Sequence, residues 1–301
     1  METWETRSKW AELVKRDFFA EYTYEARRRY QKSATALQLE PSAWIVEVGC
    51  GTGRYHKLLR EIGYCNVVSC DLTREHLVRA REIDPGGLFV VASGENLPFK
   101  TGVFDGLVTN AAIEHFADPN KGVQEFARVT AQDGRLVVTS DCYSWRLLQL
   151  LGLYKSKMPI DRTLTYGSFR ALFRAAGLEI VEADAWGVTH YLRRLARVSR
   201  LFGRLAESAT RDDHWSNRKT TNLLTLSLRM LLLDENLFVL AKTPGTRRKI
   251  SAVARSPLRL LEVLACPQCR GALSADDGGQ HLSCGGCGGQ FPVVDGIPSF
   301  V

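Results

Sequence analysis

Residues Ile45-Val46-Glu47-Val48-Gly49-Cys50-Gly51-Thr52-Gly53 run from an apolar stretch directly into a turn with glycine at every second position. An apolar run followed by such a turn predicts a buried strand, the turn itself and then a helix. Glycine lets the backbone approach a ligand closely and adopt conformations that other residues avoid. The stretch therefore predicts an α/β fold with a ligand site at the carboxyl end of this strand.

Short β-branched runs alternate with amphipathic helical segments from this turn to about residue 140. The alternation indicates helices on both faces of a mostly parallel sheet, a Rossmann-like, doubly wound arrangement. We expect helices at 55–62, 74–82, 120–129 and 168–176, the last ended by a left-handed Gly177. Seven strands are expected, at Trp44–Val48, Asn66–Cys70, Leu88–Ala92, Phe104–Thr109, Arg135–Ser140, 178–186 and 237–242.

Asp71 follows the second expected strand, eighteen residues after Gly53. A carboxylate in this place can accept hydrogen bonds from both ribose hydroxyls of a nucleoside cofactor. The dinucleotide fingerprint needs a third glycine at position 54, which Arg54 occupies, so NAD is disfavoured. The alternative is a tight turn without a ligand, which the combination of strand, glycines and spaced acid argues against.

Residues 40–142, and more loosely 160–242, resemble the class I S-adenosylmethionine-dependent methyltransferases, above all the broad family that includes the ubiquinone and menaquinone methyltransferases. The resemblance implies that the turn at Gly49, Gly51 and Gly53 holds the methionine end of S-adenosylmethionine. It also implies that Glu47 helps to hold the amino group of the cofactor, and that Asp71 binds the ribose.

The segment Ala92–Phe99 matches the adenine-binding stretch of that family, with Ser93 where Asp is usual. A hydroxyl accepts a hydrogen bond more weakly than a carboxylate. The segment Phe104–Phe116 matches the fourth strand of the family and the loop beyond it. The cofactor-binding residues implied in these two segments are Ser93, Gly94, Glu95 and Asn110.

Methyl transfer requires alignment of nucleophile, methyl group and sulfur, and sometimes a base. His115 and Glu114 are the first candidates for that base, and Asp141 and Tyr143, after the fifth strand, are the second pair. His115 can accept a proton near neutral pH without special tuning, although it could equally only pack in its loop. An acceptor that is already an enolate, thiolate or amine needs no base.

Cys266-Pro267-Gln268-Cys269 and Cys284-Gly285-Gly286-Cys287 are two pairs of cysteines fourteen residues apart. This spacing predicts four thiolates around one structural zinc ion, with no position left open for catalysis. A tail of ~40 residues is too short to stabilise a core without such a staple. A redox dithiol is the alternative, although it usually involves a single pair.

The tail from Leu260 to Pro298 resembles the small zinc-binding activator subunit of tRNA, rRNA and translation-factor methyltransferases. The resemblance implies that the tail docks on a methyltransferase domain and stabilises it. Because the two are covalently joined, we expect it to dock on its own chain or on the twin in a homodimer.

We expect a methyltransferase domain at 1–242, with a helical cap at 1–40 and a helical lid inserted at 187–235, then a linker at 243–256 and a zinc-ribbon-like accessory domain at 257–301. No segment has the ~18 consecutive apolar residues of a membrane span, and the N-terminus lacks the pattern of a secretory signal. We therefore expect a cytoplasmic protein. Its net charge of +7 permits contact with phosphates or anionic lipid but decides neither.

The segment 190–206 has apolar residues at helical spacing, interleaved with five arginines. It is consistent with a helical cap that has a solvated basic rim, with a helix in peripheral contact with a membrane, or with a phosphate-binding face for RNA. We expect a small lipophilic acceptor such as a quinone, a lipid-linked intermediate or a natural product. The alternatives are a tRNA or translation factor, disfavoured because no RNA module is recognised, and a non-catalytic adaptor that binds the cofactor.

Overall fold

The computed structural model describes residues 24–141, 164, 166–186, 236–245 and 259–301. The first part of the expected cap, the expected lid with its 190–206 segment, Tyr143 and most of the linker lie outside those residues. Within the described part of the chain, no helix is long and apolar enough to cross a bilayer.

A seven-stranded sheet forms the centre of the large domain, in the order β3-β2-β1-β4-β5-β7-β6. Its strands are β1 (Trp44–Val48), β2 (Asn66–Asp71), β3 (Leu88–Val91), β4 (Phe104–Asn110), β5 (Thr130–Asp141), β6 (Glu179–Trp186) and β7 (Asn236–Lys242). The first five strands are parallel, whereas β7 is antiparallel to both of its neighbours. The predicted mostly parallel, Rossmann-like sheet is confirmed.

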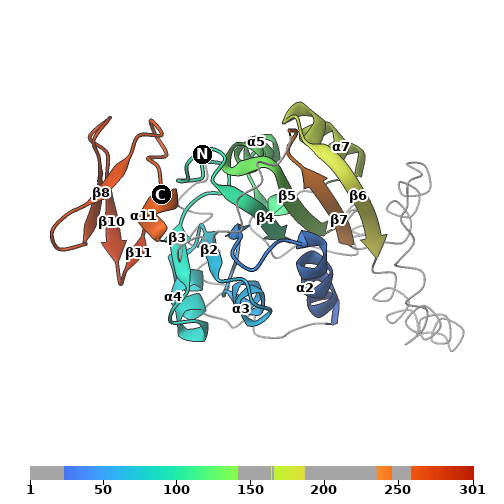
Figure 1. Cartoon of the computed structure of the whole chain (residues 1–301), viewed down its shortest axis with the longest axis horizontal. Coiled ribbons are helices and arrows are strands. Elements are labelled where there is room, and N and C mark those ends of the chain that lie inside the picture. Colours follow the sequence, from blue (N-terminus) through green and yellow to red (C-terminus); the bar gives the residue numbers. More distant parts are fainter. Residues whose placement is uncertain (1–23, 142–163, 165, 187–235, 246–258) are drawn as a thin grey trace, which may run out of the picture.

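Helices cover both faces of this sheet (Figure 1). The helices α2 (Tyr24–Leu37), α3 (Arg54–Glu61) and α4 (Arg74–Ile83) lie along one side, and α5 (Pro119–Val129) and α7 (Tyr166–Ala175) along the other. The side chain of Asp118 caps the start of α5 by accepting the backbone N–H groups of Asn120 and Lys121. Gly177, with a φ of 73°, follows the end of α7 as the sequence predicted.

Successive residues of each strand supply two different cores, because side chains alternate between the faces of a sheet. Ile45 belongs to the core beneath α2 and α3. Val46, its neighbour in β1, belongs to the core that includes Phe126 of α5 and Phe169 of α7. Both faces are apolar, which explains why β1 is hydrophobic at every position except Glu47.

The connection between β3 and β4, residues 92–103, contains no helix. A crossover between parallel strands usually carries one, and that helix buries part of the sheet. Here the C-terminal domain covers this part. Its Val263, Leu264 and Phe300 belong to the same hydrophobic core as Val90 and Phe99.

The C-terminal domain consists of the short helix α11 (Leu260–Val263) and a four-stranded antiparallel sheet beside β3 and α4 (Figure 1). Its strands are β8 (Leu273–Ala275), β9 (His281–Cys284), β10 (Gln290–Val294) and β11 (Ile297–Pro298). Three backbone hydrogen bonds cross the junction, from Phe300 N to Val91 O, Ala265 N to Pro98 O and Lys100 N to Val263 O. The expected docking of the tail thus occurs within one chain.

Candidate cofactor pocket and metal centre

A pocket opens at the carboxyl ends of β1, β2 and β4, and its empty volume, including the part open to solvent, is about 680 Å³. Of the residues predicted to bind the cofactor, Gly49, Gly51, Asp71 and Gly94 line it. The pocket therefore lies where the sequence places the nucleoside cofactor.

The glycine turn forms one wall of the pocket because its backbone lies close to the loop after β4. Gly49 has a φ of 74°, and a Cβ added to it would lie 2.4 Å from the Cβ of Ala112. Gly51 has a φ of 52° and faces open space. A side chain at Gly49 would displace the opposite wall, and one at Gly51 would require a strained backbone.

Asp71, at the end of β2, presents its carboxylate to this pocket. Its Oδ2 accepts the backbone N–H of Gly51, and its Oδ1 accepts that of Thr73 and lies 2.9 Å from Nδ1 of His76. Burial alone would raise the pKa of this carboxyl, but His76 and the backbone N–H groups outweigh it and hold the pKa below its usual value. An ionised acceptor is thus fixed beside the glycine turn, as a ribose hydroxyl requires.

Glu47 is the fourth of the five residues of β1, two positions before Gly49, and does not line the pocket. Its Oε2 accepts a hydrogen bond from Ser69 Oγ, which in turn lies 2.7 Å from His56 Nδ1. Burial raises the pKa of Glu47 to about 8, against the lowering effect of Ser69. Its proposed contact with the amino group of the cofactor stays a prediction.

Three other predicted cofactor residues hold the loops around the pocket. Ser93 Oγ accepts the backbone N–H of Glu95, and Glu95 Oε1 accepts that of Ala117. Asn110 Oδ1 accepts hydrogen bonds from Ser33 Oγ and Thr139 Oγ1. These contacts tie the loops after β3 and β4 to each other and to α2, and none of the three residues lines the pocket.

His115 is the predicted base that lines the pocket. It ends the short 3-10 helix η1 (Ile113–His115) in the loop after β4. Glu114 is buried and off the pocket wall. Asp141 is the last residue of β5, and the position of its side chain lies outside what the structure describes.

Several residues of the pocket wall were not predicted from the sequence, among them Thr73, His76, Ala112 and Phe116. His76 could have been predicted, because a histidine in the first turn of a helix can face an acid that ends the preceding strand. The position of Phe116 was harder to predict. Its ring packs against Gly94 and Gly122, which lie far apart from each other in the sequence.

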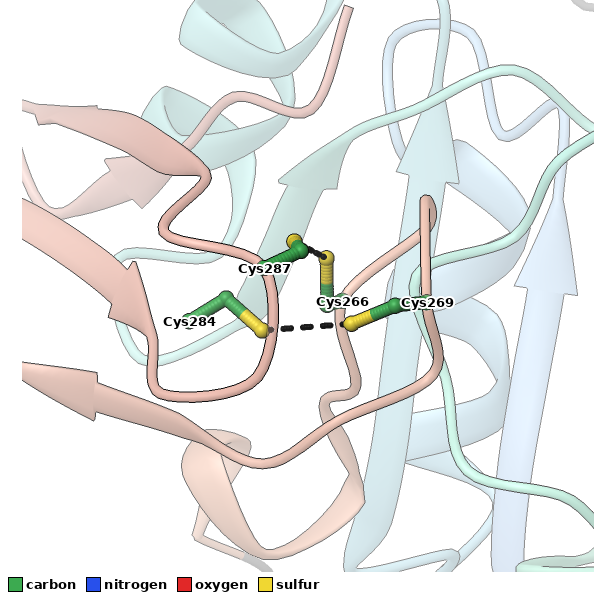
Figure 2. A group of neighbouring side chains, drawn as sticks. All are labelled: Cys266, Cys269, Cys284 and Cys287. Carbon is green, nitrogen blue, oxygen red and sulfur yellow. Dashed lines mark hydrogen bonds between the residues drawn. The ribbon is translucent and has the colours of Figure 1, made fainter.

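The four predicted zinc ligands lie together in the C-terminal domain (Figure 2). The Sγ atoms of Cys266 and Cys287 are 3.6 Å apart, those of Cys269 and Cys284 are 3.4 Å apart, and all four lie within 4.8 Å of one another. Ligands ~2.3 Å from one tetrahedral ion would lie ~3.8 Å apart. The cluster therefore fits a single zinc ion, and the sulfurs are too far apart for disulfides.

Backbone N–H groups favour the thiolate form of Cys284, whereas at Cys287 the lowering effect of the Gly289 N–H is outweighed by hydrogen bonds with Cys269 and Cys266, which raise the pKa of that thiol to about 12. The N–H groups of Cys287 and, next, Gly286 lower the pKa of Cys284 to about 6. Thiolates are the form that binds zinc. Cys284 is thus the thiol of the cluster that most readily supplies a thiolate to the metal.

Two family models match separate parts of the chain. Residues 46–138 match the family described as a methyltransferase domain, and residues 258–296 match the Trm112p-like protein family. The first match covers the glycine turn, Asp71 and the loop of His115, and the second includes all four cysteines.

Curated relatives of different substrate classes share the first region. The probable tRNA methyltransferase 9B of Homo sapiens is 30% identical over 113 residues, which are 36% of this chain and 23% of that protein. The demethylmenaquinone methyltransferase of Beutenbergia cavernae is 31% identical over 103 residues, which are 34% of this chain and 42% of that protein. The chain thus spans less than half the length of these relatives.

Among solved structures, a chain from the complex between the Haloferax volcanii Trm112 methyltransferase activator and the putative methyltransferase has a TM-score of 0.57. It is 18% identical, and the alignment covers 81% of this chain and 99% of that chain. This similarity shows the fold. The two family matches place a methyltransferase domain at residues 46–138 and a Trm112-like domain at residues 258–296 of one chain, and the fold agrees with both.

Proposed function

We propose that this protein transfers a methyl group from S-adenosylmethionine to a small, lipophilic acceptor, with the zinc domain docked on the catalytic domain as a structural support. The observation that carries the proposal is the ionised Asp71 fixed beside Gly49 and Gly51 at the carboxyl end of the sheet. These residues suit a nucleoside whose ribose is a hydrogen-bond donor and whose amino-acid part needs close backbone approach.

S-adenosylmethionine supplies an electrophilic methyl group on a sulfonium, so the leaving group needs no acid. The chain has to hold the nucleoside, exclude competing water and align the acceptor. We assign the binding of the cofactor to Asp71 and the glycine turn. Asp71 and His76 bind each other, and we assign the removal of a proton from the acceptor to His115, which lines the same pocket.

The apolar character of the site supports a small lipophilic acceptor. Ala111, Ala112 and Phe116 form the wall beside His115. The similarity to a demethylmenaquinone methyltransferase and the apolar residues in the sequence of 187–235 point the same way. A quinone, a lipid-linked intermediate or a natural product fits this description.

A tRNA or a translation factor is the second candidate. The similarity to a probable tRNA methyltransferase, the Trm112-like domain and the five arginines within 190–206 favour it. Phosphate contacts from such arginines would make binding strongly dependent on salt.

Incubation of the full chain with methyl-labelled S-adenosylmethionine and cell extract tests both candidates. The extract is then separated into lipid, small-molecule, RNA and protein pools, with the Asp71→Ala variant as the inactive control. Label in the lipid or small-molecule pool supports the first candidate, and label in RNA or protein supports the second. Cofactor binding without label in any pool would instead indicate a non-catalytic adaptor.

A further inference from the structure

His76 is a buried histidine of the pocket wall that the proposed methyl transfer does not use directly. It lies in the first turn of α4 with 4% of its surface exposed, and its Nδ1 is 2.9 Å from Oδ1 of Asp71. An ionised carboxylate only accepts hydrogen bonds, so Nδ1 must carry the hydrogen. The imidazole is therefore a donor to the acid that we assign to the ribose.

The donors around Asp71 determine which of its oxygens remains available to a ligand. Each carboxylate oxygen has two lone-pair directions. Oδ1 already accepts from Thr73 N and His76 Nδ1, whereas Oδ2 accepts only from Gly51 N. Among the described residues, Oδ2 is thus the oxygen with an acceptor position left, on the side where Gly51 lines the pocket.

His76 and Thr73 hold Asp71 by different means. The backbone N–H of Thr73 belongs to the turn before α4 and is the same for every residue type except proline. His76 reaches Asp71 through its side chain from within the helix, so it ties the orientation of the carboxylate to the position of α4. A hydrogen bond to a charged group of this kind contributes more than one between neutral groups.

We propose that His76 is a positioning residue for the cofactor, which locks the Asp71 carboxylate so that Oδ2 receives a ribose hydroxyl. The proposal rests on the proposed function, since it needs a ribose in this pocket. It adds a residue to the site that acts through Asp71 and has no part in the methyl transfer itself.

Calorimetric titration of the full, zinc-loaded chain with S-adenosylhomocysteine tests this role. His76→Leu removes the donor and should weaken binding ~10- to 100-fold, the range expected for a hydrogen bond to a charged group. His76→Asn offers an amide N–H at the place of Nδ1 and should stay within ~3-fold of the parent. His76→Gln, the matched amide with a longer reach, should lose ~10-fold.

A double-mutant cycle with Asp71→Asn separates positioning from general packing. In that background His76→Leu should have no further effect, because the group through which His76 acts is already altered. An equal loss in both backgrounds, or binding by His76→Leu as tight as that of the parent, would overturn the proposal. If His76→Leu does not fold, the Asn and Gln pair still decides, since equal affinities of these two variants contradict it.

The outcomes for the two proposals are distinct. A parent chain that does not bind S-adenosylhomocysteine contradicts the proposed function itself. A parent that binds it, with His76 variants that bind equally well, contradicts the role of His76 alone.

Discussion

The guanidinium of Arg270 in the zinc domain donates to Glu125 of the methyltransferase domain, with Nη2 3.1 Å from Oε1. Glu125 is also bound by Arg128 and accepts the backbone N–H of Leu97. Arg270 itself donates to the carbonyl of Leu97 and to Asn96 Oδ1. A residue directly after a zinc ligand therefore helps to hold the loop that carries Gly94 in the pocket wall.

The Arg270→Ala variant should destabilise the docked domain by about 1–2 kcal/mol, because Glu125 and the carbonyl of Leu97 lose a charged donor. This loss of stability is smaller than the loss expected for a fully buried ion pair, because the Arg270 side chain is about one-third exposed. Thermal unfolding of the full chain measures the change. Arg259→Ala, an exposed arginine of the same domain, is the matched control and should melt like the parent.

Removal of zinc should lower the stability of the methyltransferase domain as well as that of the tail. Cys266 and Cys284 belong to the same hydrophobic core as Val90 and Phe126, so a disordered tail would expose part of that core. Chelation, or the Cys269→Ser variant, should lower the melting temperature, and added zinc should restore it only for the chelated parent. A single melting transition unaffected by chelator would show that the cluster does not hold a structural metal.

Asp71→Ala should weaken S-adenosylhomocysteine binding about 100-fold, because it removes the ribose acceptor and leaves Gly51 N–H without its partner. Calorimetry provides the measurement. Glu82→Ala, which removes an exposed acid from α4, is the control and should bind normally. Affinity unchanged by Asp71→Ala would remove the ribose assignment.

Local sequence patterns predicted the sheet well because each strand and helix has its own signal. The boundaries of β1 agree with the structure, and α4 and α5 differ by one residue from the predicted ranges. The position of Asp71 in the pocket wall and the grouping of the four cysteines were predictable for the same reason, since both follow from spacing along a short stretch of chain. The order of the strands in the sheet was not predicted, because it depends on contacts between segments far apart in the chain.

Contacts between segments far apart in the sequence could not be predicted from such local patterns. Nothing in the sequence around Glu95 indicates that its carboxylate holds the backbone of Ala117, and nothing around Arg270 indicates Glu125. The side chain of Glu47 does not line the pocket, and its carboxylate instead accepts a hydrogen bond from Ser69 of the neighbouring strand β2. These arrangements follow from the packing of whole elements.

Glu47 gives the fold a dependence on pH that can be measured. Its pKa is about 8 in the folded protein, against an ordinary value of 4.5, chiefly because burial disfavours the charged form. The folded state therefore binds a proton that the unfolded chain has already released between these two values. The contribution of Glu47 is fully present below pH 4.5 and is lost as the pH rises through 8.

Glu47→Gln should remove this dependence, because the amide does not titrate and its carbonyl can still accept from Ser69 Oγ. Relative to the parent, the variant should gain stability on the order of 3–4 kcal/mol between pH 5 and pH 8, measured by urea unfolding at several pH values. Glu40→Gln, at an exposed glutamate before β1, should keep the parental slope. Equal pH dependence of the parent and Glu47→Gln would mean that Glu47 is ionised in the folded state. A loss of S-adenosylhomocysteine affinity in Glu47→Gln, with unchanged stability, would instead assign the side chain to the cofactor.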